Sequence, residues 1–157
     1  MNAVASNTSP AKRLEHYLHD NIPLVQHMQI QVVSYDEHEL VLSAPLAANI
    51  NHTQTAFGGS LAALTTLACW GSLWLLLNPE ADTHIVVNES HLHYLRPVTD
   101  TLTAHCKLPA AETCRRFVDT LQRRGKARIK MSAIVEQDGE TCVEFSGTFV
   151  AFRDENR

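Results

Sequence analysis

One stretch of the chain, residues 51–77, limits the possible folds more than any other: NHTQTAFGGSLAALTTLACWGSLWLLL. From Gly58 onwards this stretch carries no charged residue. A helix that is apolar on every side must be surrounded either by protein or by lipid. Turn-forming polar residues precede the Gly-Gly-Ser segment, so we expect a long helix that begins near Gly58. Its polar N-terminal end is where we expect the chemistry.

Alternating apolar and polar residues predict β-strands before this helix. Residues 28–32 alternate in this way, and so do residues 40–44, with a turn at 35–38 between them. This pattern is typical of a β-hairpin with one buried face. A loop at 47–57 then leads into the helix.

The same alternation predicts a second group of strands after the helix, at 84–96, 102–108, 127–135 and 143–151. Asp138-Gly139 joins the last two strands and is a strong signal for a type I′ hairpin turn. Residues 109–125 show no clear period, and we expect them to be irregular or to form a short helical turn.

The N-terminal segment is expected to hold one short helix. Ser9-Pro10 is a suitable start, with serine as N-cap and proline in the first turn, and Pro23 ends or deflects the helix. Residues 1–9 are expected to form a flexible tail. Because no repeat or linker is visible, residues 1–157 are interpreted as a single domain.

The predicted strands favour protein over lipid as the cover of the long helix. Each amphipathic strand needs an apolar partner, and a helix that is apolar all round supplies one. A membrane span would leave the strands uncovered, and the helix also lacks flanking Lys or Arg. We therefore expect no membrane partner.

Composition narrows the function classes further. The chain has 157 residues and a formal net charge of -4 at pH 7, which does not favour nucleic-acid binding. The N-terminus has no apolar core of a secretory signal, so a cytoplasmic location is expected. Four cysteines without a paired motif are expected to be buried thiols: Cys69, Cys106, Cys114 and Cys142.

The order of these elements resembles the hotdog fold, an α+β fold in which a curled antiparallel β-sheet wraps a long central helix. Three segments resemble hotdog acyl-CoA thioesterases: NHTQTAFGGS at 51–60, HLHYLRPV at 91–98, and the final hairpin with Gly125 and Asp138-Gly139. The resemblance is strongest to the thioesterase-like domain at the C-terminus of YiiD-type acetyltransferases, over roughly residues 22–152. It implies a hotdog domain with a short N-terminal helix.

Gly58 and Gly59 are the first candidates for catalysis. A helix N-terminus presents unpaired N–H groups and a partial positive charge, and glycine lets a ligand approach the backbone closely. These amides are therefore expected to form an oxyanion hole for a thioester. The alternative is that the two glycines only allow close packing of the helix against the sheet.

The resemblance and the local chemistry give roles to the residues around Gly58. Asn51 matches the loop asparagine that positions substrate or water in the family, although it is equally typical of a turn. Thr55, Phe57 and Ser60 are expected to line the substrate site, and Thr55 or Ser60 is expected to cap the helix.

Two departures from the family pattern leave the general base open. Phe57 stands where many relatives have histidine, and Thr66 stands where many have a helix carboxylate. Thr66 is expected to order a water molecule. Glu89 is the leading candidate for the base, because a period of two places it on one strand face with a set of mostly apolar residues and histidines: Ile85, Val87, His91, His93 and Leu95. The alternative for Glu89 is an ion pair with His91 or His93.

Two further groups bear on ligands. His91 and His93 have no recognisable third ligand, so no metal site is expected. Residues 115–130 hold most of the basic side chains, and Arg124, Lys126 and Arg128 are expected to bind coenzyme A phosphates or an acidic acyl carrier protein. The alternative is a solvated strand face. No cofactor is expected apart from the coenzyme A of the substrate.

These features favour a homodimer, or a dimer of dimers, that hydrolyses acyl thioesters of coenzyme A or carrier protein at a shared interface site. A domain that binds or senses acyl-CoA without catalysis is the main alternative, since the helix lacks a carboxylate. A hydroxyacyl-thioester dehydratase ranks lower, because that reaction needs a histidine and a carboxylate near the helix.

Overall fold

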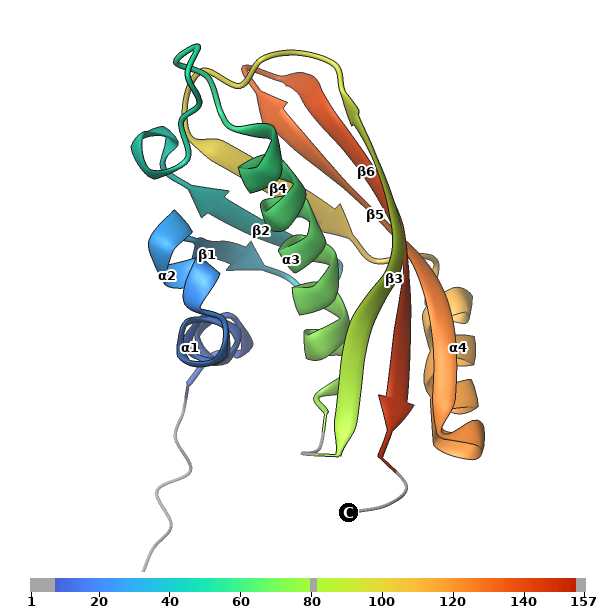
Figure 1. Ribbon diagram of the computed structural model, residues 1–157. Helices are drawn as coiled ribbons and strands as arrows, with labels where there is room; N and C mark the ends of the chain where they lie inside the picture. Colours follow the sequence, from blue (N-terminus) through green and yellow to red (C-terminus); the bar gives the residue numbers. More distant parts are fainter. Residues whose placement is uncertain (1–7, 80–81, 155–157) are drawn as a thin grey trace, which may run out of the picture.

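The computed structural model describes residues 8–79 and 82–154, and these form a curled six-stranded sheet around a long helix (Figure 1). The helices are α1 (Pro10–Asn21), α2 (Pro23–Met28), α3 (Gly58–Leu77) and α4 (Ala111–Arg124), with a 3-10 turn at Leu46–Ala48. The strands are β1 (Gln31–Tyr35), β2 (Glu39–Ala44), β3 (Thr83–Tyr94), β4 (Leu102–Lys107), β5 (Lys126–Gln137) and β6 (Glu140–Arg153). This is the predicted α+β hotdog architecture.

All neighbouring strands of the sheet are antiparallel, in the order β1-β2-β4-β5-β6-β3. β1 and β3 are therefore the two edges. β4 and β5 pair only through Ala104 with Val135 and His105 with Ile134. α4 packs beside the first half of β5.

Helix α3 lies inside the curl of the sheet, as predicted, and contacts five of the six strands. Its sheet-facing side chains belong to the main core, where Leu64, Ala68 and Leu73 are fully buried. α3 is the one helix in the described residues whose length and hydropathy would suit a membrane span, and half of its most apolar window is buried within the protein. The amphipathic strands thus supply the cover that the sequence demanded.

The N-terminal helix starts where the sequence predicts, because the N–H of Lys12 donates to the Ser9 Oγ over 3.3 Å. Ser9 therefore belongs to the helix cap, and the first seven residues of the expected 1–9 tail lie outside the described residues. Pro23 deflects the chain into a second helix, α2, which ends at Gln29 in the left-handed region (φ 58°). The predicted strand at 28–32 begins only at Gln31. Residues 23–28 form α2 instead, because Pro23 suits the first turn of a new helix.

The expectation that residues 109–125 are irregular or form only a short helical turn is wrong, since α4 spans fourteen of them. Cys114, Phe117 and Leu121 recur at helical spacing and form its buried side, surrounded by charged residues. Gly125 ends the helix with φ 69°, a left-handed conformation that glycine adopts without strain. The Asp138-Gly139 turn, by contrast, is confirmed, with φ values of 53° and 76°.

Candidate active site

The candidate site begins at the N-terminus of α3. Phe57 is the N-cap residue, and no side chain accepts a hydrogen bond from the first turn. Capping by Thr55 or Ser60 was therefore wrongly predicted. The first intrahelical bond runs from the Leu61 N–H to the Phe57 carbonyl oxygen over 3.1 Å. The N–H groups of Gly58, Gly59 and Ser60, here called the amide cradle, precede it and have no acceptor among the described residues.

Backbone hydrogen bonds hold the cradle in place. The Ala56 N–H donates to the Val98 carbonyl over 2.8 Å, and the Phe57 N–H donates to the Asn49 carbonyl over 2.7 Å. The chain therefore enters α3 between the segment that follows β3 and the segment that follows β2. Both neighbours fix the direction in which the cradle donors point.

Two aromatic side chains frame the cradle. The Tyr94 hydroxyl, at the end of β3, donates to the Gly58 carbonyl over 3.1 Å. The Phe57 ring is half exposed and lies against Gly59, where an added Cβ would come within 2.4 Å of its Cε1. Tyr94 lies inside the HLHYLRPV segment that carries the family resemblance, but its sequence position alone does not indicate this contact.

Asn51 organises the loop before α3. Its Oδ1 accepts from the Thr53 N–H (2.8 Å) and the Thr55 N–H (3.1 Å), and its Nδ2 donates to the Thr55 Oγ1 (2.9 Å). These bonds match the turn role that the sequence left open beside a catalytic one. Asn51 and Thr55 therefore act on the cradle through the conformation of the loop.

Thr66 lies two turns into α3, on the half-exposed side of the helix that also contains Gly59 and Ala63. Its hydroxyl donates to the Ala62 carbonyl over 2.8 Å, which leaves the lone pairs of Oγ1 free to accept a hydrogen bond from water. The helix itself contains neither a carboxylate nor an imidazole.

Glu89 does not lie where the sequence argument placed it. The β3–β6 register shifts between Val87 and Glu89, which is a β-bulge. Val87 pairs with the fully buried Phe149, whereas Glu89 pairs with Thr148 and its carboxylate contacts the His91 Nε2 at 2.9 Å. The predicted sharing of a face with Ile85 and Val87 is wrong, because one extra residue in a strand reverses the alternation.

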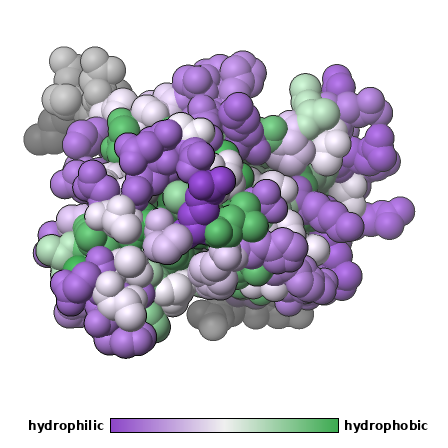
Figure 2. All heavy atoms as spheres, turned by 90° about the horizontal axis from the view of Figure 1, so that it is seen from above, coloured by the Kyte–Doolittle hydropathy of each residue, from purple (hydrophilic) through white to green (hydrophobic). Residues whose placement is uncertain are grey.

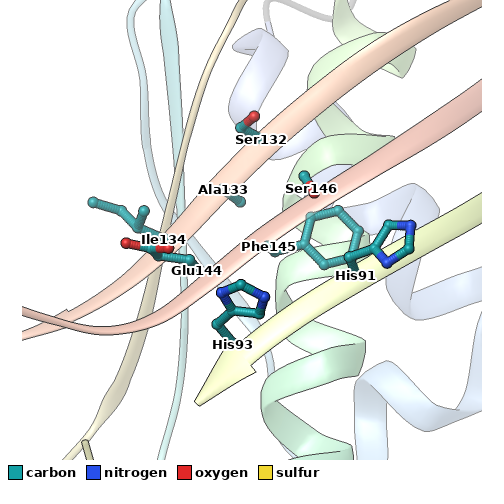
Figure 3. Close-up of a pocket in the computed structure, with 8 residues that line it drawn as sticks. All are labelled: His91, His93, Ser132, Ala133, Ile134, Glu144, Phe145 and Ser146. Atoms are coloured by element: carbon teal, nitrogen blue, oxygen red, sulfur yellow. The ribbon is translucent and has the colours of Figure 1, made fainter. Parts of the chain in front are cut away.

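The face of the sheet opposite α3 carries the residues around Glu89. A pocket of about 330 Å³ there is lined by His91 and His93 of β3, with Ser132 and Ile134 of β5 and Glu144 of β6 (Figure 3). The described residues contain no cluster of three side chains suited to a metal ion. The ion pair that the sequence offered as the alternative role of Glu89 is the arrangement observed.

The predicted basic residues are exposed and lie at the other end of the molecule from the cradle. Arg124 ends α4, and Lys126 and Arg128 begin β5 (Figure 1). β5 then runs for about 35 Å to Gln137. Gln137 accepts from the Thr99 N–H over 2.7 Å, next to the segment that anchors the cradle. No ion pair involves these three basic side chains within the described ranges.

Large apolar side chains are exposed along the β3 edge and beside the cradle: Phe57, Val86, Val87, Tyr94 and Leu95. Figure 2 looks onto the end of the molecule that holds the α3 N-terminus, and hydrophobic atoms interrupt its mainly hydrophilic surface. Further along α3, Trp70 and Trp74 pack on Tyr17 and line a pocket of about 500 Å³ beside the start of β3.

The sequence profile of the family described as "Putative thioesterase (yiiD_Cterm)" matches residues 11–153. The chain belongs to this family. This is the family that the segments at 51–60 and 91–98 resemble, and the match also includes α1 and α4.

Solved structures agree with this assignment. A protein of unknown function from Chlorobaculum tepidum is 35% identical, with a TM-score of 0.86, and the match covers 92% of this chain and 94% of that one. A "putative thioesterase" from Shewanella oneidensis is also 35% identical, with a TM-score of 0.82 and coverage of 91% and 97%. A Haemophilus influenzae thioesterase, at 15% identity and a TM-score of 0.73 with coverage of 96% and 97%, shares the hotdog fold.

Proposed function

We propose that this protein hydrolyses acyl thioesters of coenzyme A or of an acyl carrier protein. The observation that carries the proposal is the amide cradle: three N–H donors that have no acceptor within residues 8–79 and 82–154, at the N-terminus of the long central helix, in a member of a family described as a putative thioesterase. The thioester carbonyl oxygen accepts hydrogen bonds from these donors. When water attacks, the same donors stabilise the oxyanion, and one such donor contributes about 3 kcal/mol to a transition state.

The proposed site needs two protomers. Gly59 and Thr66 are seven residues apart, which is about 10 Å along a helix. A water molecule on Thr66 therefore cannot reach a carbonyl carbon held by the cradle of the same chain. In a symmetric dimer with antiparallel central helices, Thr66 of the partner subunit would face the cradle instead.

The exposed edge strand β3 supports such a dimer. It is twelve residues long, lies at one edge of the sheet, and exposes Val86 and Val87. A long uncovered edge is a template for pairing with another strand. Antiparallel pairing of two β3 strands about a two-fold axis would bring the basic end of one protomer, with Arg128 and Lys126, to the cradle end of the other. Arg128 and Lys126 lie on the same face of the sheet as Glu89, opposite α3, so they would attract the phosphates of coenzyme A or the acidic surface of a carrier protein at the outer rim of the site.

Glu89 has no part in this mechanism. A two-fold axis perpendicular to the sheet leaves each face on its own side, so Glu89 of either subunit stays opposite α3. The water, oriented by Thr66, bonds through its oxygen to the thioester carbon and gives one proton to solvent. The C–S bond then breaks, and the departing thiolate takes a proton from solvent. Without a carboxylate or imidazole on α3, slow turnover is expected.

The absence of a base on α3 also favours the second candidate function, a hotdog module that binds acyl-CoA without turnover. The cradle would then hold the thioester without activating it. A dehydratase finds less support, since Phe57 and Thr66 occupy the positions where that reaction needs ionisable groups.

Release of free thiol tests the proposal, measured with a thiol-reactive dye over acyl-CoAs from short to long and over the matching acyl carrier proteins. Native mass spectrometry of each sample records the bound ligand and the oligomer. Hydrolysis predicts thiol release that peaks at one acyl length. Acyl-CoA that is bound and intact, with no thiol released, would replace hydrolysis by the binding function.

A further inference from the structure

Asn49 is a buried polar residue that lies outside the amide cradle and close to it along the chain. Its side chain is only 2% exposed. The Nδ2 group donates to the Met28 carbonyl over 2.9 Å and to the Pro45 carbonyl over 2.8 Å. One side chain thus joins the end of α2 to the end of β2.

The backbone of Asn49 makes the third connection. Its carbonyl oxygen accepts from the N–H of Phe57, the N-cap of α3, over 2.7 Å, and its own N–H donates to the Leu46 carbonyl over 2.9 Å. The residue therefore links two framework elements to the residue from which the cradle starts. No other contact on the β2 side reaches the Phe57 N–H within the described residues.

The chemistry at this position requires an amide. Two carbonyl oxygens face Nδ2, and only a group with two N–H donors and no charge satisfies both. The Oδ1 atom is buried without a partner in the described part of the chain, which is an unfavourable arrangement for an acceptor. A side chain that served only to fill space would carry no such cost, so the two donated bonds are the function of this residue.

From these contacts we infer that Asn49 is a positioning residue for the amide cradle. It fixes the position and direction of the first turn of α3, because it holds Phe57 to the ends of α2 and β2. Misplacement of reacting groups by about 1 Å can cost on the order of a hundredfold in rate. This inference rests on the proposed function for its catalytic consequence, but the structural part stands without it.

The test compares Asn49→Ala with Ser72→Ala. Ser72 is equally buried, and its hydroxyl donates to the Ala68 carbonyl over 2.9 Å in the middle of α3, far from the cradle. Amide hydrogen exchange is measured residue by residue by NMR, and kcat and KM are measured below the unfolding range of each variant. Asn49→Ala is expected to speed exchange of the Phe57 and Leu61 amides at least about tenfold relative to the α3 core amides. It is also expected to lower kcat at least about tenfold with KM nearly unchanged.

Ser72→Ala is expected to lower stability without either effect. Equal exchange of the Phe57 and Leu61 amides in the two variants would overturn the positioning role, and so would an unchanged kcat in Asn49→Ala. If Asn49→Ala does not fold, Asn49→Ser, which retains one donor, should show the same changes at smaller size.

The exchange measurement separates this inference from the proposed function. If the wild-type protein hydrolyses no thioester, the proposed function fails. Faster exchange at Phe57 and Leu61 in Asn49→Ala would still establish the positioning role, and unchanged exchange would still refute it.

Discussion

The Phe57 ring lies so close to Gly59 that a Cβ added to residue 59 would come within 2.4 Å of its Cε1 atom. Side-chain carbons do not approach one another so closely, so any residue larger than glycine at position 59 must displace the ring. At Gly58 the corresponding Cβ would meet the Tyr94 ring at 3.6 Å, which is an ordinary contact. The two adjacent glycines therefore differ in what they tolerate.

Gly59→Ala is expected to lower kcat/KM at least about tenfold, equivalent to about 1.4 kcal/mol, because the displaced Phe57 ring disturbs the mouth of the cradle. Gly58→Ala is the matched control and should stay within about threefold of wild type. Thermal unfolding should show neither variant strongly destabilised, since alanine favours helix over glycine by up to about 1 kcal/mol. The rate of thiol release gives kcat/KM for both variants.

The double variant Phe57→Ala/Gly59→Ala removes the clash and is expected to recover part of the activity that Gly59→Ala loses. Coupling of this kind is typical of residues in direct contact. Equal losses in Gly58→Ala and Gly59→Ala would contradict the role given to the Phe57 ring.

Thr66 should respond to changes in its hydroxyl group. Thr66→Val keeps the shape and removes the water acceptor, so kcat is expected to fall roughly tenfold, whereas Thr66→Ser should retain most of it. Thr66→Asp adds a carboxylate base to α3 at the position proposed to orient the water, and kcat is expected to rise. Because the ionised carboxylate is the active form, the rate of this variant should increase with pH through the carboxyl pKa, ordinarily about 4.

Thiol release as a function of pH, at saturating acyl-CoA, checks these three variants. A Thr66→Val protein as active as wild type would remove Thr66 from the mechanism. A Thr66→Asp protein that binds acyl-CoA normally without faster turnover would show that the water does not lie beside residue 66.

Most of the fold could be predicted because its signals are local. The uncharged run from Gly58 to Leu77 and the alternation in β5 and β6 each specify one element and its buried side. α4 is harder to predict because its apolar positions are few and stand among arginines, so the helical spacing of Phe117 and Leu121 is a weak signal.

The same distinction between local signals and signals that depend on the tertiary fold applies to the site. The cradle at Gly58 and Gly59 could be predicted, since a helix start is a local event. The contact between Tyr94 and Gly58 joins residues 36 positions apart and depends on the tertiary fold. The face on which Glu89 lies depends on a single β-bulge, which strict alternation cannot reveal.

Substitution of Glu89 is expected to leave turnover nearly unchanged. Its side chain is 60% exposed on the face opposite α3 and contacts His91. Glu89→Gln should keep kcat and KM within about twofold of wild type, since an exposed ion pair contributes at most about 1 kcal/mol. Thiol release compares this variant with Thr66→Val. A large fall in kcat for Glu89→Gln, at unchanged dimer content, would return Glu89 to the reaction centre.

The proposed dimer is tested at the edge strands, which offer a matched pair of exposed valines. Val87 on β3 is 43% exposed, and Val33 on β1, at the other edge of the sheet, is 58% exposed. Val87→Lys would place like charges close together across two paired β3 strands, which is destabilising. We expect monomers of Val87→Lys by native mass spectrometry and loss of thiol release, because Thr66 of the partner subunit no longer reaches the cradle. Val33→Lys should remain dimeric and active, and a fully active Val87→Lys monomer would refute the shared site.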